Sequence, residues 1–511
     1  MTSHLVHHFL ERTASRSPDQ LFLIHGSERI TYGDLDAGSN RLARLLCSAG
    51  IRRGDRVGLL ALNSRLYVES YYAILKAGAV AVPLNTAMDG ATLRQTLADC
   101  SARALLAGPR FEKLLNVAIT GLPELDRLVL PDPTKLATIP ARIQALPFAA
   151  ALDQPATPPP VRTIDLDLAS IVYTSGSTGA PRGVMLSHLN LVANTRAIVS
   201  YLELSPADRV LAVLPFYYVY GKSLLNTHAA AGGTVVIENR FLYPSTALET
   251  LEQEACSGLA GVPSTYAILL NKSAFPEMPL PSLRYMTQAG GPMAPELTRR
   301  LLAAKPGVRL YVMYGATEAG ARLSYLHPDD LPTKLGSIGK AIPNVELRVL
   351  RDDGTPCEAD ETGEIVARGS TIMDGYWGAP AETAQVLSEH GYHTGDLGRC
   401  DADGYFWIVG RKKDIIKACA HRISAQEIEH AMLEFPEVHE AAVIGVPDDV
   451  QGEAIKAFVV FRGDPAVCAA SLEQFLKKRL PAYKWPSRIE AVPELPKNEA
   501  GKIMKQRLRE A

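Results

Sequence analysis

The sequence lacks the features that mark membrane-spanning, secreted or zinc-stapled proteins. Its apolar runs, such as residues 57–62, are far too short to cross a bilayer, and its N-terminus lacks the cationic stretch and apolar core of a signal peptide. Only seven cysteines occur among 511 residues, with no CxxC pair, which favours a reducing compartment and argues against structural zinc. The net charge of −2 gives no general attraction to nucleic acid or anionic lipid. We therefore expect a cytoplasmic protein with no integral membrane segment and no nucleic-acid partner.

The chain does have the length and apolar content of a large globular protein. Apolar residues make up 47% and charged residues 21%, which is ordinary for a soluble fold with more than one domain. Between residues 20 and 85, runs typical of strands alternate with helical ones: 21–24, 32–49, 57–62, 64–76 and 79–82. This rhythm predicts a doubly wound parallel sheet. The proline-rich residues 130–163 suit an exposed connection, and residues 336–411 predict a more antiparallel, β-rich subdomain.

A domain boundary is predicted near Lys413. Before it, a turn feeds the strand-like residues 405–409, and after it Ser424 to Glu427 resembles a capping box that opens a helix. The sequence thus predicts an α/β protein with a large N-terminal domain, residues 1–412, and a small α+β C-terminal domain, residues 413–511.

Residues 173–188, YTSGSTGAPRGVMLSH, suit a polyphosphate. Gly176, Gly179 and Gly183 allow unusual backbone angles, and Arg182 adds a fixed positive charge. Hydroxyl donors come from Thr174, Ser175, Ser177 and Thr178. A buried strand precedes the loop, and Ser187 can cap the helix that follows. The segment is not a Walker A loop, and the alternative is a Ser/Gly-rich surface turn.

Four further motifs follow in order: YVMYGATE at 311–318, YHTGD at 392–396, GRKKD at 410–414 and PKNEAGK at 496–502. Together with the loop, they resemble the ordered motifs of the acyl-adenylate-forming superfamily, which contains acyl-CoA synthetases, peptide-synthetase adenylation domains and luciferases. The resemblance spans nearly the whole chain, although Arg182 stands where the family usually has lysine. It implies that ATP and Mg²⁺ convert a carboxylic acid to acyl-AMP, which a thiol, most simply coenzyme A, then intercepts.

The resemblance also assigns roles to individual residues. Lys502 would bridge the attacking carboxylate and the phosphate, Thr317 would bind the α-phosphate and Glu318 would hold the metal. Lys413 falls at the hinge about which the small, mobile domain rotates between the two half-reactions. The alternative for Lys502 is a solvated lysine near the end of the chain, and the alternative for Thr317 and Glu318 is a polar turn after a strand.

The nucleotide's base and ribose are assigned to a second group of residues. Asp396 would accept hydrogen bonds from both ribose hydroxyls, with Arg411 assisting from the same side. The resemblance places Gly290, Gly291 and Pro292 against adenine. It adds Tyr314 and Gly315 to the nucleotide-binding residues. Tyr314 would stack on the base, with a core tyrosine as the alternative.

The chain departs from the family pattern in two places. In the family, glycine is common where this chain has Cys419 and Ala420. By the resemblance, these residues, with His421 and Arg422, would border the thiol channel. The methyl group of Ala420 would then narrow that channel. Acyl-CoA ligases often carry histidine at Tyr218. The predicted acyl pocket comprises Tyr217, Tyr218, Tyr220, Gly221, Lys222, Val262, Tyr266, Ala316 and Ala319. For Lys222, a surface lysine is the favoured interpretation over a substrate contact.

Three alternatives to an acid–CoA ligase stay open at this point. The enzyme would charge the phosphopantetheine of an acyl carrier protein, or the chain would be a non-catalytic nucleotide sensor, or it would oxidise its adenylate as luciferases do. Retention of Glu318, Asp396 and Lys502 argues against the sensor. The absence of Asp and Glu from residues 214–226 argues against an α-amino acid substrate.

Overall fold

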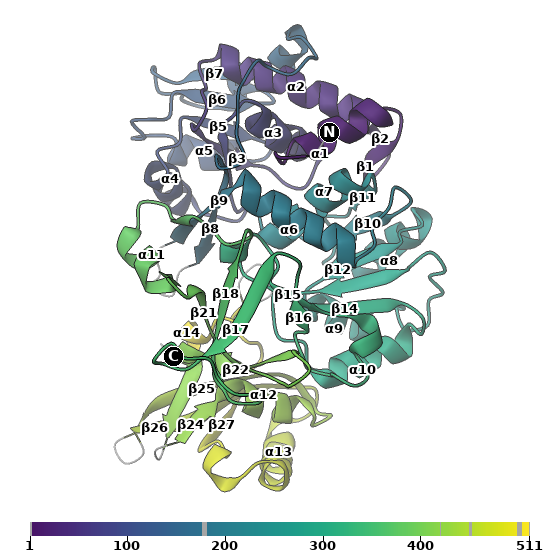
Figure 1. The fold of residues 1–511 in the computed structure, drawn as a ribbon, viewed down its shortest axis with the longest axis vertical. Helices are drawn as coiled ribbons and strands as arrows, with labels where there is room; N and C mark the ends of the chain where they lie inside the picture. Colours follow the sequence, from purple (N-terminus) through teal and green to yellow (C-terminus); the bar gives the residue numbers. More distant parts are fainter. Residues whose placement is uncertain (1–2, 176–180, 419–420, 449–451, 498–502, 510–511) are drawn as a thin grey trace.

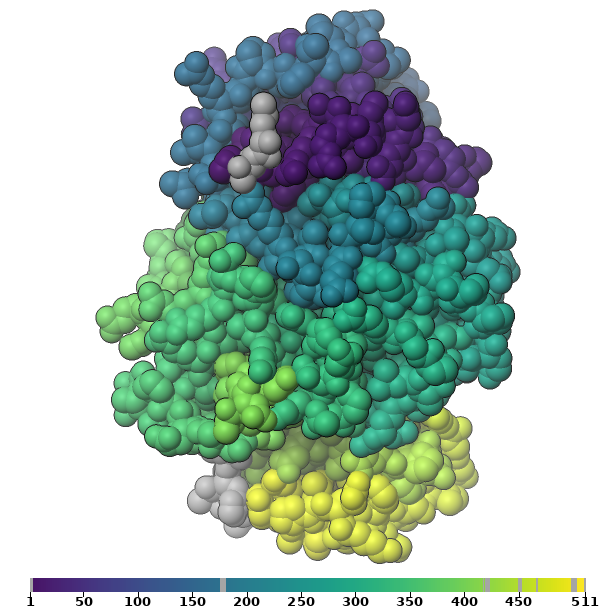
Figure 2. Space-filling model, turned by 45° about the vertical axis from the view of Figure 1, so that its right-hand side comes forward, coloured from purple at the N-terminus to yellow at the C-terminus, as the bar shows by residue number. Residues whose placement is uncertain are grey.

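The structure is a computed structural model that describes residues 3–175, 181–418, 421–448, 452–497 and 503–509. Two large sheets form the upper and right-hand parts of the molecule in Figure 1, a smaller green sheet lies beside them on the left, and the C-terminal sheet lies at the bottom. Figure 2 shows purple and blue residues at one end of the long axis, teal and green residues in the middle and yellow residues at the other end. The predicted fold class, a large α/β N-terminal part with a small C-terminal one, is confirmed.

The first large sheet has nine strands in the order β16-β15-β14-β13-β12-β10-β11-β1-β2. Its strands are β1 (Leu21–His25), β2 (Glu28–Thr31), β10 (Arg209–Ala212), β11 (Thr234–Ile237), β12 (Gly258–Gly261), β13 (Tyr285–Gln288), β14 (Arg309–Tyr314), β15 (Ser324–Leu326) and β16 (Lys340–Ala341). The inner strands pair in parallel, as expected for β-runs joined by helices. Strand β1 lies in this sheet, so the predicted strands of residues 20–85 divide between two sheets.

The second large sheet has eight strands in the order β19-β9-β8-β4-β3-β5-β6-β7. Its strands are β3 (Arg56–Leu60), β4 (Val80–Pro83), β5 (Ala104–Ala107), β6 (Arg127–Leu130), β7 (Gln144–Pro147), β8 (Leu168–Ser175), β9 (Pro181–Ser187) and β19 (Gly375–Tyr376). The proline-rich stretch therefore contains an edge strand, β7, which pairs only through β6. An edge position tolerates proline because one side of the strand needs no partner.

Helices cover both faces of the large sheets. The largest apolar core joins both sheets to α2 (Tyr32–Ser48), α3 (Arg65–Lys76), α6 (His188–Tyr201) and α7 (Val219–Ala231), with α1 (His8–Arg16) beside them. On the outer faces, α8 (Pro244–Gln253), α9 (Pro263–Lys272) and α10 (Pro295–Ala304) pack on the first sheet, and α4 (Gly90–Asp99) and α5 (Glu112–Ala118) pack on the second. These helices bury the apolar runs of the parallel strands on both sides.

Two smaller sheets follow. One contains β17 (Val345–Leu350), β18 (Gly363–Gly369), β20 (Leu387–Ser388), β21 (Gly391–Cys400) and β22 (Phe406–Arg411), all antiparallel, with α11 (Pro380–Val386) nearby. The other contains β23 (Ile415–Ala418), β24 (His421–Ser424), β25 (Val438–Asp448), β26 (Gly452–Phe461) and β27 (Arg488–Ala491). It packs against α12 (Ala425–Leu433) and α13 (Pro465–Arg479), and α14 (Lys505–Arg509) contacts β25.

The strand and the helix expected on either side of the glycine-rich segment are β8 and α6, and a further strand that was not predicted precedes the helix. Residues 181–187 form β9, which pairs antiparallel with β8, so the segment connects two strands. Gly183 lies inside β9, where an added Cβ would come within 2.8 Å of the Ile171 side chain. A glycine at position 183 therefore allows β9 to pack closely against β8. Ser187 does cap α6 as predicted, because its hydroxyl accepts from the amide of Asn190. Within the described residues, no helix is long and apolar enough to cross a membrane.

Candidate active site

One group of predicted site residues lies where β14, β21 and β22 meet. Asp396 on β21 and Arg411 on β22 face each other in the ladder, and Arg411 Nε lies 2.7 Å from Asp396 Oδ1. The hydroxyl of Tyr314, at the end of β14, donates to Asp396 Oδ2 at 2.5 Å. We call these three residues the ribose corner, after the ribose contact that the sequence predicts for Asp396 and that stays a prediction. Two segments that are 82 residues apart are thus joined around one carboxylate.

The ribose corner is held in a fixed geometry. The side chain of Asp396 is only 7% exposed, and Arg411 Nη1 also donates to the carbonyl of Thr394 at 3.0 Å. Burial and the nearby Asp396 charge raise the pKa of Tyr314 well above its usual value, so its hydroxyl stays a donor. Sequence reasoning missed this bond, since nothing in the chain pairs Tyr314 with Asp396. The stacking of Tyr314 on a base stays a prediction.

A second group surrounds Glu318, the predicted metal ligand. Glu318 belongs to a short helix, η3 (Thr317–Ala319), that follows β14, and its Oε1 accepts a hydrogen bond of 2.9 Å from the hydroxyl of Tyr376. The guanidinium of Arg182 lies 5.6 Å from the centre of the Tyr376 ring. Tyr376 therefore connects the glycine-rich hairpin to Glu318. Sequence reasoning missed it as well, although its glycine-rich surroundings, DGYWG at 374–378, were a usable signal.

This arrangement suits a hard divalent cation. A carboxylate is the ligand type that Mg²⁺ prefers. Among the described residues, Glu318 Oε2 has no hydrogen-bond or ion-pair partner, while Oε1 is held by Tyr376. The donor set thus fits a metal bound through one carboxylate oxygen and ligands from the phosphates.

The predicted adenine segment follows β13. Gly290 has a φ of +85°, a conformation that favours glycine, and an added Cβ there would lie 3.2 Å from Val262 Cγ1. Gln288 Nε2 donates to the carbonyl of Gly291 at 2.8 Å, which fixes this turn. At Gly315, an added Cβ would lie 2.1 Å from the carbonyl oxygen of Ala321, so close backbone packing explains that glycine.

The predicted acyl-pocket residues are only partly brought together. Tyr217 and Tyr218 lie beside each other, with ring centres 4.5 Å apart. Tyr266 is completely buried and donates to the carbonyls of Leu259 and Thr287, as a core tyrosine would. Ala319 packs into the core of the β-rich subdomain, and Ala316 lies at the edge of the same core.

Gly221 and Lys222, two other residues of the predicted acyl pocket, make close contacts inside the protein. An added Cβ at Gly221 would lie 2.1 Å from the carbonyl oxygen of Pro215, so the start of α7 needs a glycine there. The surface interpretation of Lys222 is wrong. Its side chain is buried, and Nζ donates to Ser170 Oγ at 3.0 Å. Burial lowers its pKa to about 7.

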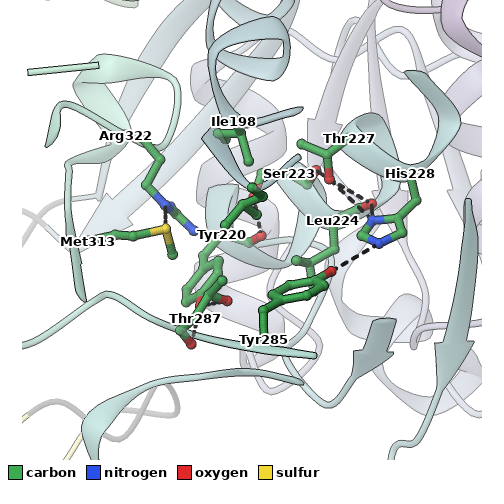
Figure 3. A pocket seen from close by; sticks show the side chains of 11 residues that line it. Ile198, Tyr220, Ser223, Leu224, Thr227, His228, Tyr285, Thr287, Met313 and Arg322 are labelled. Carbon is green, nitrogen blue, oxygen red and sulfur yellow. Dashed lines mark hydrogen bonds between the residues drawn. The ribbon is translucent and has the colours of Figure 1, made fainter. Parts of the chain in front are cut away.

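A small cavity of about 10 Å³ lies along α7, and of the predicted pocket residues only Tyr220 lines it. Figure 3 shows its side chains converging from α6, α7, β13 and β14. We call it the α7 cavity, and its lining residues are Ile198, Leu202, Tyr220, Ser223, Leu224, Thr227, His228, Tyr285, Thr287, Met313 and Arg322. Sequence reasoning missed the others because they come from five separate segments.

Several predicted residues lie outside the described residues: Gly176, Ser177, Thr178, Gly179, Cys419, Ala420 and Lys502. Of the flanking positions, Thr174 pairs with Arg182 across the β8–β9 hairpin. Lys413 lies in η5 (Lys412–Asp414), between β22 of the third sheet and β23 of the fourth. His421 and Arg422 belong to β24, at its start. Their roles stay predictions.

Comparison with known proteins assigns the chain to a family. Residues 10–377 match the AMP-binding enzyme family, and residues 427–502 match the AMP-binding enzyme C-terminal domain. The chain belongs to this family, which confirms the predicted acyl-adenylate-forming superfamily.

Curated relatives match along almost the whole chain. It is 34% identical to a feruloyl-CoA synthase of Amycolatopsis sp, over 98% of this chain and 97% of the relative. It is 32% identical to an indoleacetate–CoA ligase of Aromatoleum aromaticum, with 98% and 97% covered. It is 34% identical to a sulfoacetate–CoA ligase of Cupriavidus necator, with 97% and 95% covered.

Solved structures of similar fold carry nucleotide ligands. An anthranilate CoA ligase in complex with anthranoyl-AMP matches with a TM-score of 0.90 at 28% identity, covering 99% of this chain and 96% of that one. An o-succinylbenzoate coenzyme A synthetase from Bacillus subtilis, in complex with ATP and magnesium, matches with a TM-score of 0.83 at 26% identity, with 98% of each chain covered.

Proposed function

We propose that the chain is an ATP-dependent, AMP-forming ligase that joins a small carboxylic acid to the thiol of coenzyme A. The observation that carries the proposal is the ribose corner, with Glu318 only four residues beyond Tyr314, in a chain whose curated relatives are CoA ligases. Use of ATP and Mg²⁺ agrees with the family and with the ATP- and magnesium-bound neighbour.

The first half-reaction is the attack of the acid's carboxylate oxygen on the α-phosphorus of ATP, which breaks the bond to pyrophosphate and leaves acyl-AMP. Asp396, preset by Arg411 and Tyr314, would accept hydrogen bonds from the ribose and so fix the α-phosphate in line. Glu318 would hold Mg²⁺, which when bound offsets phosphate charge. Lys502 would place its ammonium between the two reacting anions.

In the second half-reaction the thiol sulfur attacks the acyl carbonyl and AMP leaves. We infer that residues 413–511 rotate about Lys413 between the two steps, which is supported by the change of sheet between Arg411 and Ile415. Residues 419–422 would then border the thiol channel.

The test is to incubate the purified chain with ATP, Mg²⁺ and a panel of carboxylic acids, and to measure AMP, pyrophosphate and hydroxamate trapped from acyl-AMP. We expect AMP and pyrophosphate in equal amounts, dependent on the acid. Release of ADP, or no acid-dependent product with any acid, would refute the proposal. Thioester formation with coenzyme A against phosphopantetheinylated carrier proteins identifies the acceptor, and faster loading of a carrier protein would overturn coenzyme A.

A further inference from the structure

The inference rests on the proposed function and concerns the far end of the acid. Arg322 follows η3 by three residues, and its side chain is 2% exposed. Arginine keeps its positive charge at any physiological pH, and a buried charge is costly unless an anion pairs with it. No ion pair formed by the described residues includes Arg322. A permanent cation is thus buried in the described part of the fold without a carboxylate.

The contacts of Arg322 are all neutral. Nε donates to the thioether sulfur of Met313 at 3.3 Å, and Nη1 donates to the carbonyl of Ala321 at 2.9 Å. The guanidinium lies 4.0 Å from the ring centre of Tyr220, and it also interacts with the hydroxyls of Tyr201 and Tyr220. A guanidinium has five N–H donors in a planar fork, so these contacts leave it suited to a further, anionic acceptor.

The α7 cavity lies at this guanidinium, and Arg322 is the one permanent charge among its lining residues. His228, on the far side in Figure 3, is neutral near pH 7 because burial lowers its pKa to about 4. Hydroxyls of Ser223, Thr227 and Tyr285 add polar groups. The lining thus offers one cation and neutral hydrogen-bonding groups, with no carboxylate to compete for the cation.

Two residues that line the cavity lie close in sequence to residues that are predicted to bind the nucleotide. Met313 directly precedes Tyr314 of the ribose corner, and Thr287 lies three residues before Gly290 of the adenine segment. An acid whose carboxylate meets the α-phosphate at these strand ends would extend its other end along α7. The volume of about 10 Å³ holds one water-sized group, such as a single oxygen of an end group.

We propose that the α7 cavity is an anion subsite in which Arg322 pairs with a second carboxylate or a sulfonate at the far end of a short acid substrate. Arg322 is then a specificity-determining residue. Two of the proteins that this chain resembles are named for such acids, sulfoacetate and o-succinylbenzoate, each of which carries a second anionic group.

The experiment uses pairs of acids with the same skeleton: acetate and sulfoacetate, pentanoate and glutarate, benzoate and isophthalate. Pyrophosphate release is measured with the full chain, ATP and Mg²⁺. We expect kcat/KM to be at least about tenfold higher for the doubly charged member of the best pair. Arg322→Met should lower that value roughly 10- to 100-fold and leave the singly charged acid within about threefold. Arg322→Lys should retain part of the preference, because it keeps the charge but loses the fork.

Lys305→Met is the matched control. Lys305 is another buried cation, 4.7 Å from the ring centre of Phe275 and bonded to the carbonyl of Met278, but it does not line the cavity. Its replacement should leave the preference within each pair unchanged. A wild-type preference for the singly charged acid in every pair would overturn the subsite, even if the Arg322 variants fail to fold. An equal loss of kcat/KM for both acids of a pair in Arg322→Met would also overturn the subsite. Both results leave the proposed function standing, because pyrophosphate is still released.

Discussion

The ribose corner and the α7 cavity each contain an arginine, and the two arginines differ in their partners. Arg411 meets the carboxylate of Asp396 at 2.7 Å, whereas the partners of Arg322 in the described part of the chain are a thioether, a carbonyl and tyrosine side chains. The first arrangement is paired within the protein, as we expect for a site that binds ATP whichever acid is bound. The second has no anion among the described residues, and we propose that the substrate supplies one. The comparison thus predicts that a pair within the protein serves the step common to all acids, and that an arginine without a carboxylate partner selects the acid.

The largest effect is expected at Lys502, which would serve every acid alike. Lys502→Ala should slow acyl-AMP formation by about 10²–10³-fold, because an electrostatic contact to the reacting anions is lost, while thiolysis of supplied acyl-AMP continues. Single-turnover assays of the two half-reactions measure both. Lys497→Ala, whose lysine pairs with Glu440, is the control and should change neither. Equal loss of both half-reactions would contradict the assigned role.

Asp396→Asn tests the ribose corner, where the arginine is paired within the protein. It keeps the shape of the side chain but removes the charge that holds Arg411, so the KM for ATP should rise roughly 10- to 100-fold. The preference among acids should not change. Asp403→Asn is the control, since Asp403 is an exposed carboxylate paired with Lys334 at 2.6 Å. A changed acid preference with an unaltered KM for ATP would show that the two regions are not separate.

Tyr376→Phe should give a smaller effect around Glu318, the predicted metal ligand. It removes the hydroxyl that holds Glu318 Oε1 at 2.9 Å but keeps the ring beside Arg182. Loss of one neutral-to-charged hydrogen bond should raise the Mg²⁺ concentration for half-maximal activity roughly 2- to 10-fold. Magnesium titrations of pyrophosphate release measure this shift, with the exposed Tyr243→Phe as control. An unchanged requirement would separate Tyr376 from the metal.

Lys222 sharpens the comparison because it is a buried cation that can lose its proton. Its pKa is lowered to about 7, whereas an unfolded lysine titrates near 10.5. Below pH 7 both states carry the proton and the folded state bears the full cost of burying it, so Lys222→Met should be more stable than the wild type. Between about pH 7 and 10.5 the unfolded state binds more protons, so wild-type stability should rise and close the gap by at most about 1.4 kcal/mol per pH unit.

Urea unfolding of both proteins between pH 6 and pH 9.5 measures this gap in the free energy of unfolding. Lys478→Met, at an exposed position of α13, is the control and should differ from the wild type by the same small amount at every pH. A gap for Lys222→Met that widens as pH rises would show that the lysine is charged and stabilising in the folded state.

Local patterns in the sequence predicted much of the fold. The helix expected at 64–76 is α3, Arg65–Lys76, and the strand expected at 79–82 is β4, Val80–Pro83. These succeed because apolar periodicity and caps act between near neighbours in the chain. The strand before the glycine-rich segment and the helix after Ser187 were expected, but the strand at residues 181–187 was not, because its pairing with β8 and β19 decides it. Likewise, Lys222 was expected at the surface, because nothing local in the sequence shows that its side chain is buried against Ser170.

The sequence by itself determined the family, the reaction class and the identity of Asp396, Arg411, Glu318 and Lys502 as candidates, because those motifs are contiguous strings. Only the tertiary structure decided that Tyr314 holds Asp396, that Tyr376 holds Glu318, and that Arg322 lies buried at the α7 cavity with no carboxylate partner among the described residues. The two hydrogen bonds join residues that lie 82 and 58 positions apart, and only the packing of sheets and helices brings their side chains within hydrogen-bond distance.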